Sequence, residues 1–182
     1  MSRPKASMSE MKAAIMDAAE RRMQAGGFSG FSFREIADDV GIKSSSVHYH
    51  FPTKEDLAAA VIRRWSENTA SQIDREFEKD GDAVRVWTKA FRGTAIAEPH
   101  MCPCTVLGAS SHDLPEQVAA EVKSFFAMCQ SKMITQGLSK ANATELLSTI
   151  IGAMVVANAL RETAAYDRAT KAMLEERKAS AA

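Results

Sequence analysis

The sequence predicts an all-helical protein, and three observations support that prediction. Nine Gly and five Pro in 182 residues are few for an all-β chain of this size. Apolar residues recur at spacings of three and four along most of the chain, as the buried face of an α-helix requires. Residues that cap helix N-termini, such as Ser32 and Thr53, stand just before two of these apolar stretches.

The N-terminal third of the chain is expected to form four helices. Gly26 and Gly27 end the first, and Gly41 ends the second, because glycine readily adopts the left-handed conformation found at helix ends. The third is expected to be capped by one of the serines in SSSVHYHF and to stop at Phe51-Pro52. The predicted helices cover residues 9–25, 33–40, 44–50 and 54–79.

The remainder is also predicted to be helical. A fifth helix carries Val84, Trp87 and Phe91 on one face. The segment 98–116 contains three of the five prolines and is expected to be a connection with one short helix in it. The polar end from Asp167 is expected to form a weak helix or to fray. The predicted later helices cover residues 83–97, 116–136 and 143–163.

Composition and charge exclude several classes of protein. The formal net charge is zero, although residues 1–54 carry eight Lys/Arg against six Asp/Glu. No charged and apolar leader opens the chain, the longest apolar run covers only residues 149–160, and three cysteines do not suit a secreted disulfide scaffold. No hydrolase, phosphate-loop or zinc-protease motif is present. We therefore expect a soluble cytoplasmic protein that is not an enzyme and needs no cofactor or metal.

The second and third helices have the residues of a helix-turn-helix. Ala37 allows the two helices to approach, Gly41 forms the turn, and Val47 packs the third helix on the second. No carboxylate occurs between residues 41 and 54, which suits a surface that faces phosphates. The side chains expected to stay exposed are donors, hydroxyls and one aromatic: Lys43, Ser44, Ser45, Ser46, Tyr49 and His50.

These residues carry a family resemblance. The stretch FSFREIADDVGIKSSSVHYHFPTKEDLAAAV, residues 31–61, resembles the DNA-binding region of TetR-type transcriptional regulators, and the similarity covers about residues 9–62. It implies a three-helix helix-turn-helix DNA-binding domain over residues 1–54, with the motif at about 32–51. A long helix would join it to a helical effector-binding and dimerisation domain over residues 55–182.

The resemblance also implies DNA contacts. Lys54 would contact a backbone phosphate, and Ser32 or Phe33 would do so through a backbone N–H. His48 occupies the position where the family most often has tyrosine, with Tyr49 beside it. The predicted DNA-binding residues are Ser32, Phe33, Lys43, Ser44, Ser45, Ser46, His48, Tyr49, His50 and Lys54.

Two other interpretations of this motif were weighed. A metal site at His48 and His50 is disfavoured because residues two apart point to different sides of a helix and no third ligand is near. A helix-turn-helix that packs only as structure and does not contact DNA is the second alternative.

The later helices are more apolar than a single buried face requires. The family's last two long helices pair with those of a second copy as a four-helix bundle, so we expect a homodimer; the alternative is a thick monomeric core. An effector cavity is expected among helices four to seven, although apolar and aromatic residues at helical spacing often form plain core. Its predicted lining is Trp65, Trp87, Phe91, Met101, Cys104, Phe125 and Met128.

The run HMCPCTVLG leaves three possibilities open for its cysteines. If Pro103 begins a short helix, Cys104 lies in its first turn, where the helix N-terminus favours thiolate. Cys104 then resembles the cysteine of family members that sense electrophiles or oxidants. The alternatives are an inert buried thiol and a metal site formed by His100, Cys102, Cys104 and His112.

The sequence thus predicts a homodimeric transcriptional regulator, a repressor of a palindromic DNA operator released by an unknown small-molecule effector. One alternative is a thiol-based or metal sensor that acts through Cys104. Another is an architectural DNA-binding protein that needs no effector.

Overall fold

The computed structural model describes residues 7–96 and 101–180, which form nine α-helices and two 3-10 helices with no strand among them. The all-helical prediction is confirmed. The α-helices are α1 (Met8–Gly26), α2 (Phe33–Val40), α3 (Ser44–His50), α4 (Lys54–Asp80), α5 (Ala83–Ile96), α6 (Pro103–Gly108), α7 (Glu116–Thr135), α8 (Lys140–Leu160) and α9 (Thr163–Ser180), and the 3-10 helices are η1 (Phe28–Gly30) and η2 (Ser111–Asp113).

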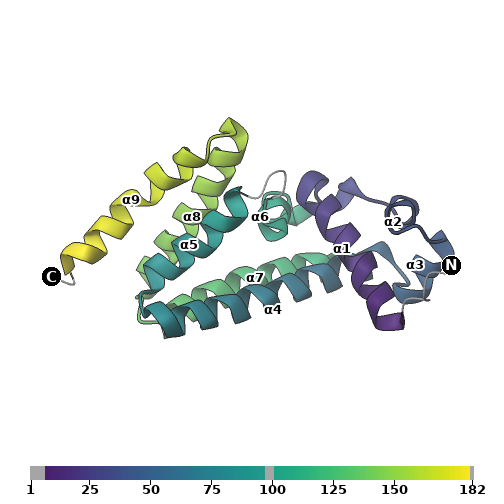
Figure 1. Cartoon of the computed structure of the whole chain (residues 1–182), viewed down its shortest axis with the longest axis horizontal. Helices are drawn as coiled ribbons and strands as arrows, with labels where there is room; N and C mark the ends of the chain where they lie inside the picture. The colour runs from purple at the N-terminus through teal and green to yellow at the C-terminus, as the bar shows by residue number, and fades with distance from the viewer. Residues whose placement is uncertain (1–6, 97–100, 181–182) are drawn as a thin grey trace, which may run out of the picture.

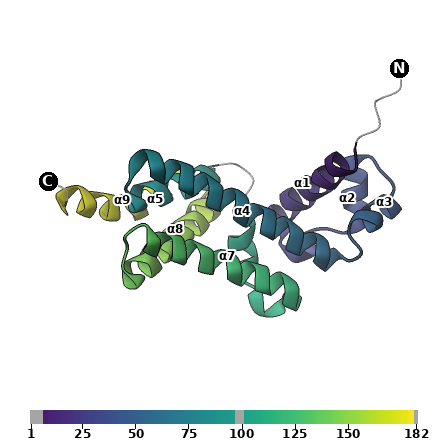
Figure 2. The ribbon, with the colours of Figure 1, turned by 90° about the horizontal axis from the view of Figure 1, so that it is seen from below.

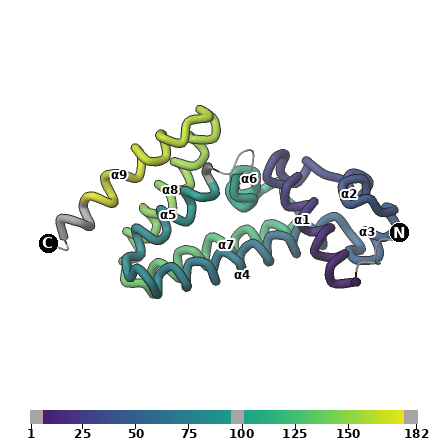
Figure 3. The backbone as a smooth tube through the Cα atoms, viewed as in Figure 1, coloured from purple at the N-terminus to yellow at the C-terminus, as the bar shows by residue number. Residues whose placement is uncertain are grey.

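The molecule is elongated, and two long helices run side by side along much of its length (Figure 1). Helices α4 and α7 lie side by side, with α1, α2 and α3 gathered at one end and α5, α8 and α9 at the other (Figure 1). The short helix α6 lies between these groups and contacts both α1 and α7 (Figure 3). Buried apolar residues form one cluster through both ends, so a domain boundary at residue 54 stays a prediction.

The N-terminal helices are fixed by capping and by one apolar seam. Thr53 accepts a hydrogen bond from the backbone N–H of Asp56, and the Asp56 carboxylate accepts one from the N–H of Thr53. This reciprocal capping starts α4 at Lys54. Ile15 and Met23 of α1 and Leu57 and Val61 of α4 are fully buried, and the two helices pack together. The second view shows α4 leaving this bundle towards the rest of the molecule (Figure 2).

A close backbone approach seats η1 on α1. A Cβ atom added to Gly30 would lie 2.9 Å from the carbonyl oxygen of Arg22, which is closer than side-chain carbons come to backbone oxygens. Glycine therefore lets the turn approach α1, and Phe31 next to it is 2% exposed. Phe33 is also buried and Phe28 is half-buried, so the three aromatic residues around Gly30 pack against this part of the core.

Arg22 joins α1 to α2. Its Nε and Nη2 donate to the two carboxylate oxygens of Asp39 at 2.6 and 2.9 Å, and its Nη1 lies 3.1 Å from Glu35. The hydrogen bond from Arg22, with its positive charge, holds the pKa of Asp39 below its usual value. The arrangement fixes the orientation of α2 on α1.

This ion pair predicts a pH-dependent stability difference. The folded pKa of Asp39 is depressed, so its contribution to stability is present above its unfolded pKa of about 4 and is lost as pH falls through the folded value. We expect Arg22→Gln to lower the free energy of unfolding at pH 7, and the difference from wild type to shrink below about pH 3. Urea unfolding at both pH values checks this; a difference that persists unchanged in acid would contradict it.

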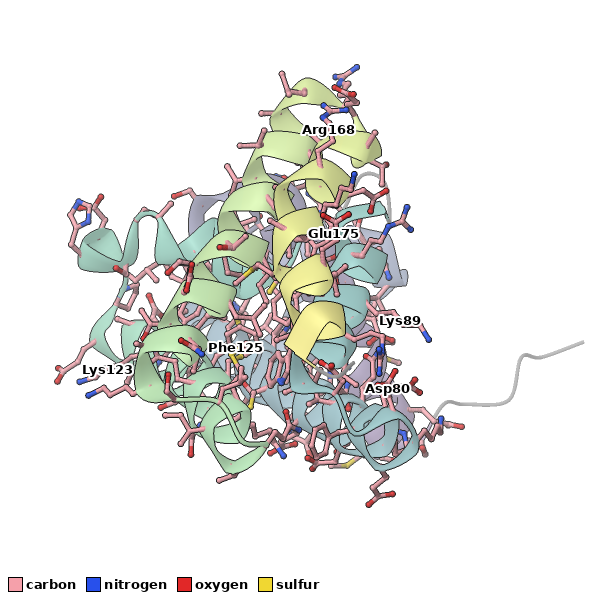
Figure 4. All side chains as sticks on the ribbon, turned by 90° about the vertical axis from the view of Figure 1, so that its left-hand side faces the viewer. Asp80, Lys89, Lys123, Phe125, Arg168 and Glu175 are labelled. Atoms are coloured by element: carbon pink, nitrogen blue, oxygen red, sulfur yellow. The ribbon has the colours of Figure 1, made fainter. Side chains whose placement is uncertain are left out.

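The far end of the molecule has its own polar contacts. The indole N–H of Trp87 donates to Gln136 at 2.7 Å, and the Lys132 ammonium lies 2.5 Å from Asp74, joining α7 to α4. Phe125 lies in the interior of this part, with Lys123 and Arg168 at its periphery (Figure 4). These contacts align α5 and α7 along α4.

The C-terminal segment differs from expectation. The last helix begins at Thr163, before Asp167, and packs against α5 and α8. Tyr166 is fully buried and donates its hydroxyl hydrogen to the carbonyl oxygen of Thr88 at 2.9 Å. Of the two expected outcomes, a helix is the one found, and one buried aromatic residue attaches this mostly polar helix to the core. Helix α8 also begins and ends three residues earlier than predicted.

Helix α8 is the most apolar element. Among the described helices it alone is long and apolar enough, by length and composition, to cross a membrane. Of its most apolar 18-residue stretch, 39% is buried in the fold. The helix extends on the N-terminal side well beyond the apolar run 149–160. The buried share faces α5, α7 and α9.

Candidate nucleic-acid interface and ligand cavity

Helices α2 and α3 pack as the sequence predicted. Gly41 adopts the left-handed conformation with φ of 75° and ends α2, and the N–H of Ile42 donates to the carbonyl oxygen of Ala37 at 2.9 Å. Ala37 is 2% exposed and Val47 is fully buried. The turn therefore presents one face of α3 to the outside of the molecule.

That face differs from expectation in one detail. Helix α3 begins at Ser44 after Lys43, and no side chain caps it. The predicted serine cap was wrong, because the serines lie inside the first turn instead of before it. Lys43 and Ser45 are exposed, and Ser44 and Ser46 are half-buried. Their hydroxyl groups are consequently not needed for capping.

The two aromatic positions of α3 have different surroundings. The His48 ring packs edge-on against Phe33 with centroids 4.6 Å apart, which fixes the imidazole over the start of α2. Tyr49 is 73% exposed; its hydroxyl donates to the sulfur of Met8 at 3.9 Å, and its ring lies 5.4 Å from that of His50. A large exposed aromatic with such weak contacts is available to a partner.

Ser32 and Phe33 lie at the start of α2. The Ser32 hydroxyl accepts from the N–H of Glu35 at 3.3 Å and donates to its carboxylate at 2.8 Å. Phe33 has a buried ring, so only its backbone N–H, in the unpaired first turn of the helix, can contact a phosphate.

Lys54 is the most constrained of the predicted DNA contacts. Its ammonium lies 4.6 Å from the ring centres of both Phe28 and Phe31, a double cation–π contact. Partial burial lowers the pKa of Lys54, opposed by the charges of Glu55 and Glu35. The lysine thus joins the N-terminus of α4 to η1 and is pre-positioned instead of free.

We expect Lys54→Ala to weaken DNA binding on all sequences and to reduce the slope of log affinity against log salt by about one. The reason is the loss of one phosphate contact. Fluorescence anisotropy at several salt concentrations measures both quantities. The matched control is Lys12→Ala, which removes an ammonium 5.4 Å from the Phe51 ring without a predicted phosphate contact. An unchanged slope in Lys54→Ala would show that this lysine serves packing alone.

A cavity of about 140 Å³ lies where α1, α4 and α5 meet. One face of α4 supplies Trp65, Thr69 and Ile73, and α5 supplies Phe91. Its remaining lining residues come from α1, α4, α5 and the residue before α6: Glu20, Asn68, Gln72, Ala90, Thr94 and Cys102. Of the predicted ligand contacts, Trp65 and Phe91 therefore line it.

The other predicted ligand contacts lie elsewhere. Trp87, Cys104 and Phe125 are fully buried in the core, outside the lining of this cavity. Met101 and Met128 are half-buried against the same core. Whether any of the seven residues contacts a ligand stays a prediction.

The cysteines are buried. Pro103 does begin α6 and Cys104 lies in its first turn, but burial raises the pKa of the Cys104 thiol well above its usual value. Burial also raises the pKa of Cys129. Burial opposes the effect of the helix N-terminus at Cys104, so this geometry favours the inert buried thiol among the three possibilities, and a sensing role stays a prediction. Within the described residues no three metal-ligating side chains are placed to hold an ion, and His100 lies outside those residues.

Comparison with known proteins identifies the architecture. Residues 15–61 match the family described as bacterial regulatory proteins, tetR family. The HTH-type transcriptional regulator LmrA of Bacillus subtilis (strain 168) is 26% identical over 151 residues, which cover 78% of this chain and 80% of LmrA. A TetR-family regulator from Agrobacterium tumefaciens is 29% identical with a TM-score of 0.82, covering 92% of this chain and 97% of that one. Residues 15–61 thus form a TetR-type DNA-binding region, and most of the chain has the fold of TetR-family regulators.

A regulator from Legionella pneumophila has the same fold, with a TM-score of 0.82 at 24% identity over 96% of this chain and 99% of its own. TetR-family proteins are DNA-binding transcriptional regulators and not enzymes, and they bind DNA operators, typically as dimers. The helix-turn-helix of this regulator is accordingly a DNA-binding element. Which of its residues contact DNA stays a prediction.

Several residues that line the cavity were not predicted from the sequence. Arg34, which is not among the predicted DNA contacts, is exposed in the first turn of α2 next to Phe33. Asn68, Thr69 and Gln72 recur at helical spacing after Trp65, which also indicates one polar face of α4. Glu20 could not have been found, because it comes from a helix distant in sequence.

The regulator also has an unpaired apolar surface on α7 and α8. A groove between the helices is lined by Phe126, Leu147 and Ile151, with polar residues at its edge. Val155, Val156 and Leu160 continue along α8 and are 44%, 49% and 59% exposed, and Ile134 of α7 is 42% exposed. This much exposed aliphatic surface on two adjacent helices is typical of an interface.

Proposed function

We propose that this regulator is a cytoplasmic homodimeric repressor that binds a palindromic operator and is released by a small molecule in the cavity between α1, α4 and α5. One observation carries the proposal. The cavity is walled by Glu20 of α1, which belongs to the DNA-binding bundle, and by Phe91 of α5, which does not. An occupant therefore contacts both parts of the molecule.

The DNA-reading part uses the exposed face of α3. Lys43, Ser45 and Tyr49 would reach into the major groove, with Ser44, Ser46, His48 and His50 around them. Lys54 and the N–H groups at Ser32 and Phe33 would bind phosphates on either side. Residues 41–54 contain no carboxylate that phosphates would repel. Two such faces bind successive major grooves when they lie roughly 34–36 Å apart.

The dimer would form through α7 and α8. The groove at Phe126 and the exposed valines of α8 supply a continuous apolar strip, and a second copy of the same strip related by a two-fold axis would cover it. This fits the share of α8 that remains outside the monomer's core.

Release would follow from a change in spacing between the two reading faces. Helix α4 runs from the DNA-binding bundle to the cavity, and α6 packs on α1 beside it. An effector that fits only the cavity of the wrongly spaced dimer draws population away from the DNA-bound form. A coupling free energy of about 1–3 kcal/mol changes operator affinity about 5- to 150-fold.

An electrophoretic shift with DNA flanking the protein's own gene tests the proposal. We expect a discrete complex of one dimer with a palindromic fragment, which disappears when the two half-sites are moved five base pairs apart. A panel of small aromatic compounds and electrophiles should contain one that releases the DNA. Binding of a monomer to the operator would contradict the repressor mechanism. Failure of every compound to release the DNA would also contradict it, provided that Cys104→Ser and wild type behave alike in the same assay.

A further inference from the structure

The wall of the cavity has an unusual charge. Among its lining residues only one side chain is a carboxylate, Glu20, and none is a lysine or arginine. A single acidic group in a part-enclosed site attracts cations and repels anions. The charge of the lining residues therefore favours cationic ligands over anionic ones.

The ion pairs of Glu20 do not neutralise all of the negative charge around it. Its Oε2 accepts a hydrogen bond from Nη2 of Arg64 at 2.8 Å, and Nη1 of the same arginine lies 2.7 Å from Asp17. Two carboxylates thus share one guanidinium. Within the described residues no group donates to the other oxygen, Oε1, of Glu20. One acceptor with a residual negative charge remains available at the cavity wall.

The α4 side of the cavity is polar where a packed helix is usually apolar. Asn68, Thr69 and Gln72 line it at helical spacing, and their side chains form no hydrogen bond with another described residue. The same is true of the Trp65 indole N–H. Thr69 is half-buried and Asn68 and Gln72 are exposed, so these side chains meet solvent in the free protein and can exchange water for the polar groups of a ligand.

Apolar and aromatic groups complete the wall. Phe91 and Ala90 of α5 and Ile73 of α4 face the polar stripe, and Trp65 lies in the same wall. Aromatic faces attract cations as well as flat apolar rings. A cavity of about 140 Å³ is close in size to the cavity of about 150 Å³ that accepts benzene.

We infer that the effector is a small organic cation with a flat apolar body, such as an aryl amidine or aryl amine, whose cationic group binds Glu20. The inference rests on the proposed function, in that it takes this cavity as the effector site. The amidinium or ammonium would donate to Glu20, the ring would contact Phe91 and Ile73, and remaining donors would face Asn68 and Gln72. Anionic ligands of the same shape would be repelled.

The same contact supplies a route to the DNA-binding bundle. Helices α1 and α4 pack together (Figure 1), and Arg64 on α4 attaches to α1 through Asp17 and Glu20, the second of which lines the cavity. A ligand cation at Glu20 competes with Arg64 for the carboxylate and weakens this ion pair. Helix α1 also carries Arg22, which orients α2 through Asp39, so a shift of α1 relative to α4 moves the reading face.

Three molecules of nearly the same shape and different charge test the inference: benzamidine as its cation, neutral benzamide, and benzoate. Binding to the full chain is measured by titration calorimetry without DNA, so the result does not depend on operator recognition or repression. We expect benzamidine to bind about tenfold or more tighter than benzamide, and benzoate to bind more weakly than both. Equal affinities, tighter binding of benzoate, or no binding of benzamidine at millimolar concentration would overturn the inference.

Variants locate the site. Glu20→Gln should abolish the preference for benzamidine over benzamide. Glu121→Gln should retain it, because Glu121 of α7 pairs with Arg63 of α4 and lies outside the cavity. Asn68→Asp adds a carboxylate at nearly constant shape and should tighten benzamidine binding. It keeps the test decisive if Glu20→Gln fails to fold. A preference that survives in Glu20→Gln, or that Asn68→Asp leaves unchanged, would place the cation elsewhere and refute the assignment.

Discussion

Val155→Arg is expected to convert the protein into a monomer and to reduce operator affinity by about 1000-fold, towards the level of nonspecific binding. Val155 is 44% exposed on α8 and lies on the same side as the groove residue Ile151, so an arginine there places an unpaired charge inside the proposed interface. A single helix-turn-helix retains only its own contacts, because the second half-site no longer adds to them. Light scattering and an operator shift measure the two effects.

The matched control is Ser71→Arg, which adds the same charge to an exposed position on α4, a helix that supplies no residue of the apolar strip. It should remain dimeric and bind the operator as wild type does. A dimer in Val155→Arg with unchanged affinity would show that the apolar strip on α8 is covered in some other way.

Tyr49→Ala is expected to lower operator affinity about 5- to 150-fold, the range of one lost base contact, without loss of fold. The side chain is 73% exposed and its hydroxyl reaches only the Met8 sulfur, so its removal should change the free energy of unfolding by less than about 0.5 kcal/mol. Operator titration with specific and scrambled DNA, together with urea unfolding, separates the two quantities.

Met8→Ala controls for the contact that Tyr49 makes within the protein. It removes the sulfur acceptor and leaves the aromatic ring, so operator affinity should stay near that of wild type. If Tyr49→Ala binds the operator as wild type does, the tyrosine is a solvent-exposed residue of α3 without a role in DNA recognition.

The helix-turn-helix could be predicted from sequence because its determinants are local. Gly41 adopts the positive φ that its position requires, Thr53 and Asp56 cap α4 reciprocally, and Val47 is buried as its spacing indicated. The serine cap of α3 was the local exception. It failed because any of three adjacent serines satisfies the same pattern, and the helix begins one residue earlier than a cap by Ser44 would require.

The cavity could be predicted only in part. Trp65 and Phe91 were found because they are aromatic residues at helical spacing, and Trp87 and Phe125 fitted the same criterion but fill the core. Spacing identifies the inward face of a helix and cannot distinguish a side chain that meets a neighbour from one that meets a void. The sequence left three possibilities open for Cys104 for the same reason, since a position in the first turn of a helix does not reveal burial.

The sequence by itself determined the all-helical fold, the helix-turn-helix and its carboxylate-free reading face, because capping, turn formation and apolar periodicity act over a few neighbouring residues. The tertiary structure alone decided which distant groups meet. It brings Glu20 of α1 to Phe91 of α5, attaches α9 through Tyr166, and buries all three cysteines. Each depends on the packing of helices far apart in the chain, where the shape of the whole core sets exposure, charge and free volume.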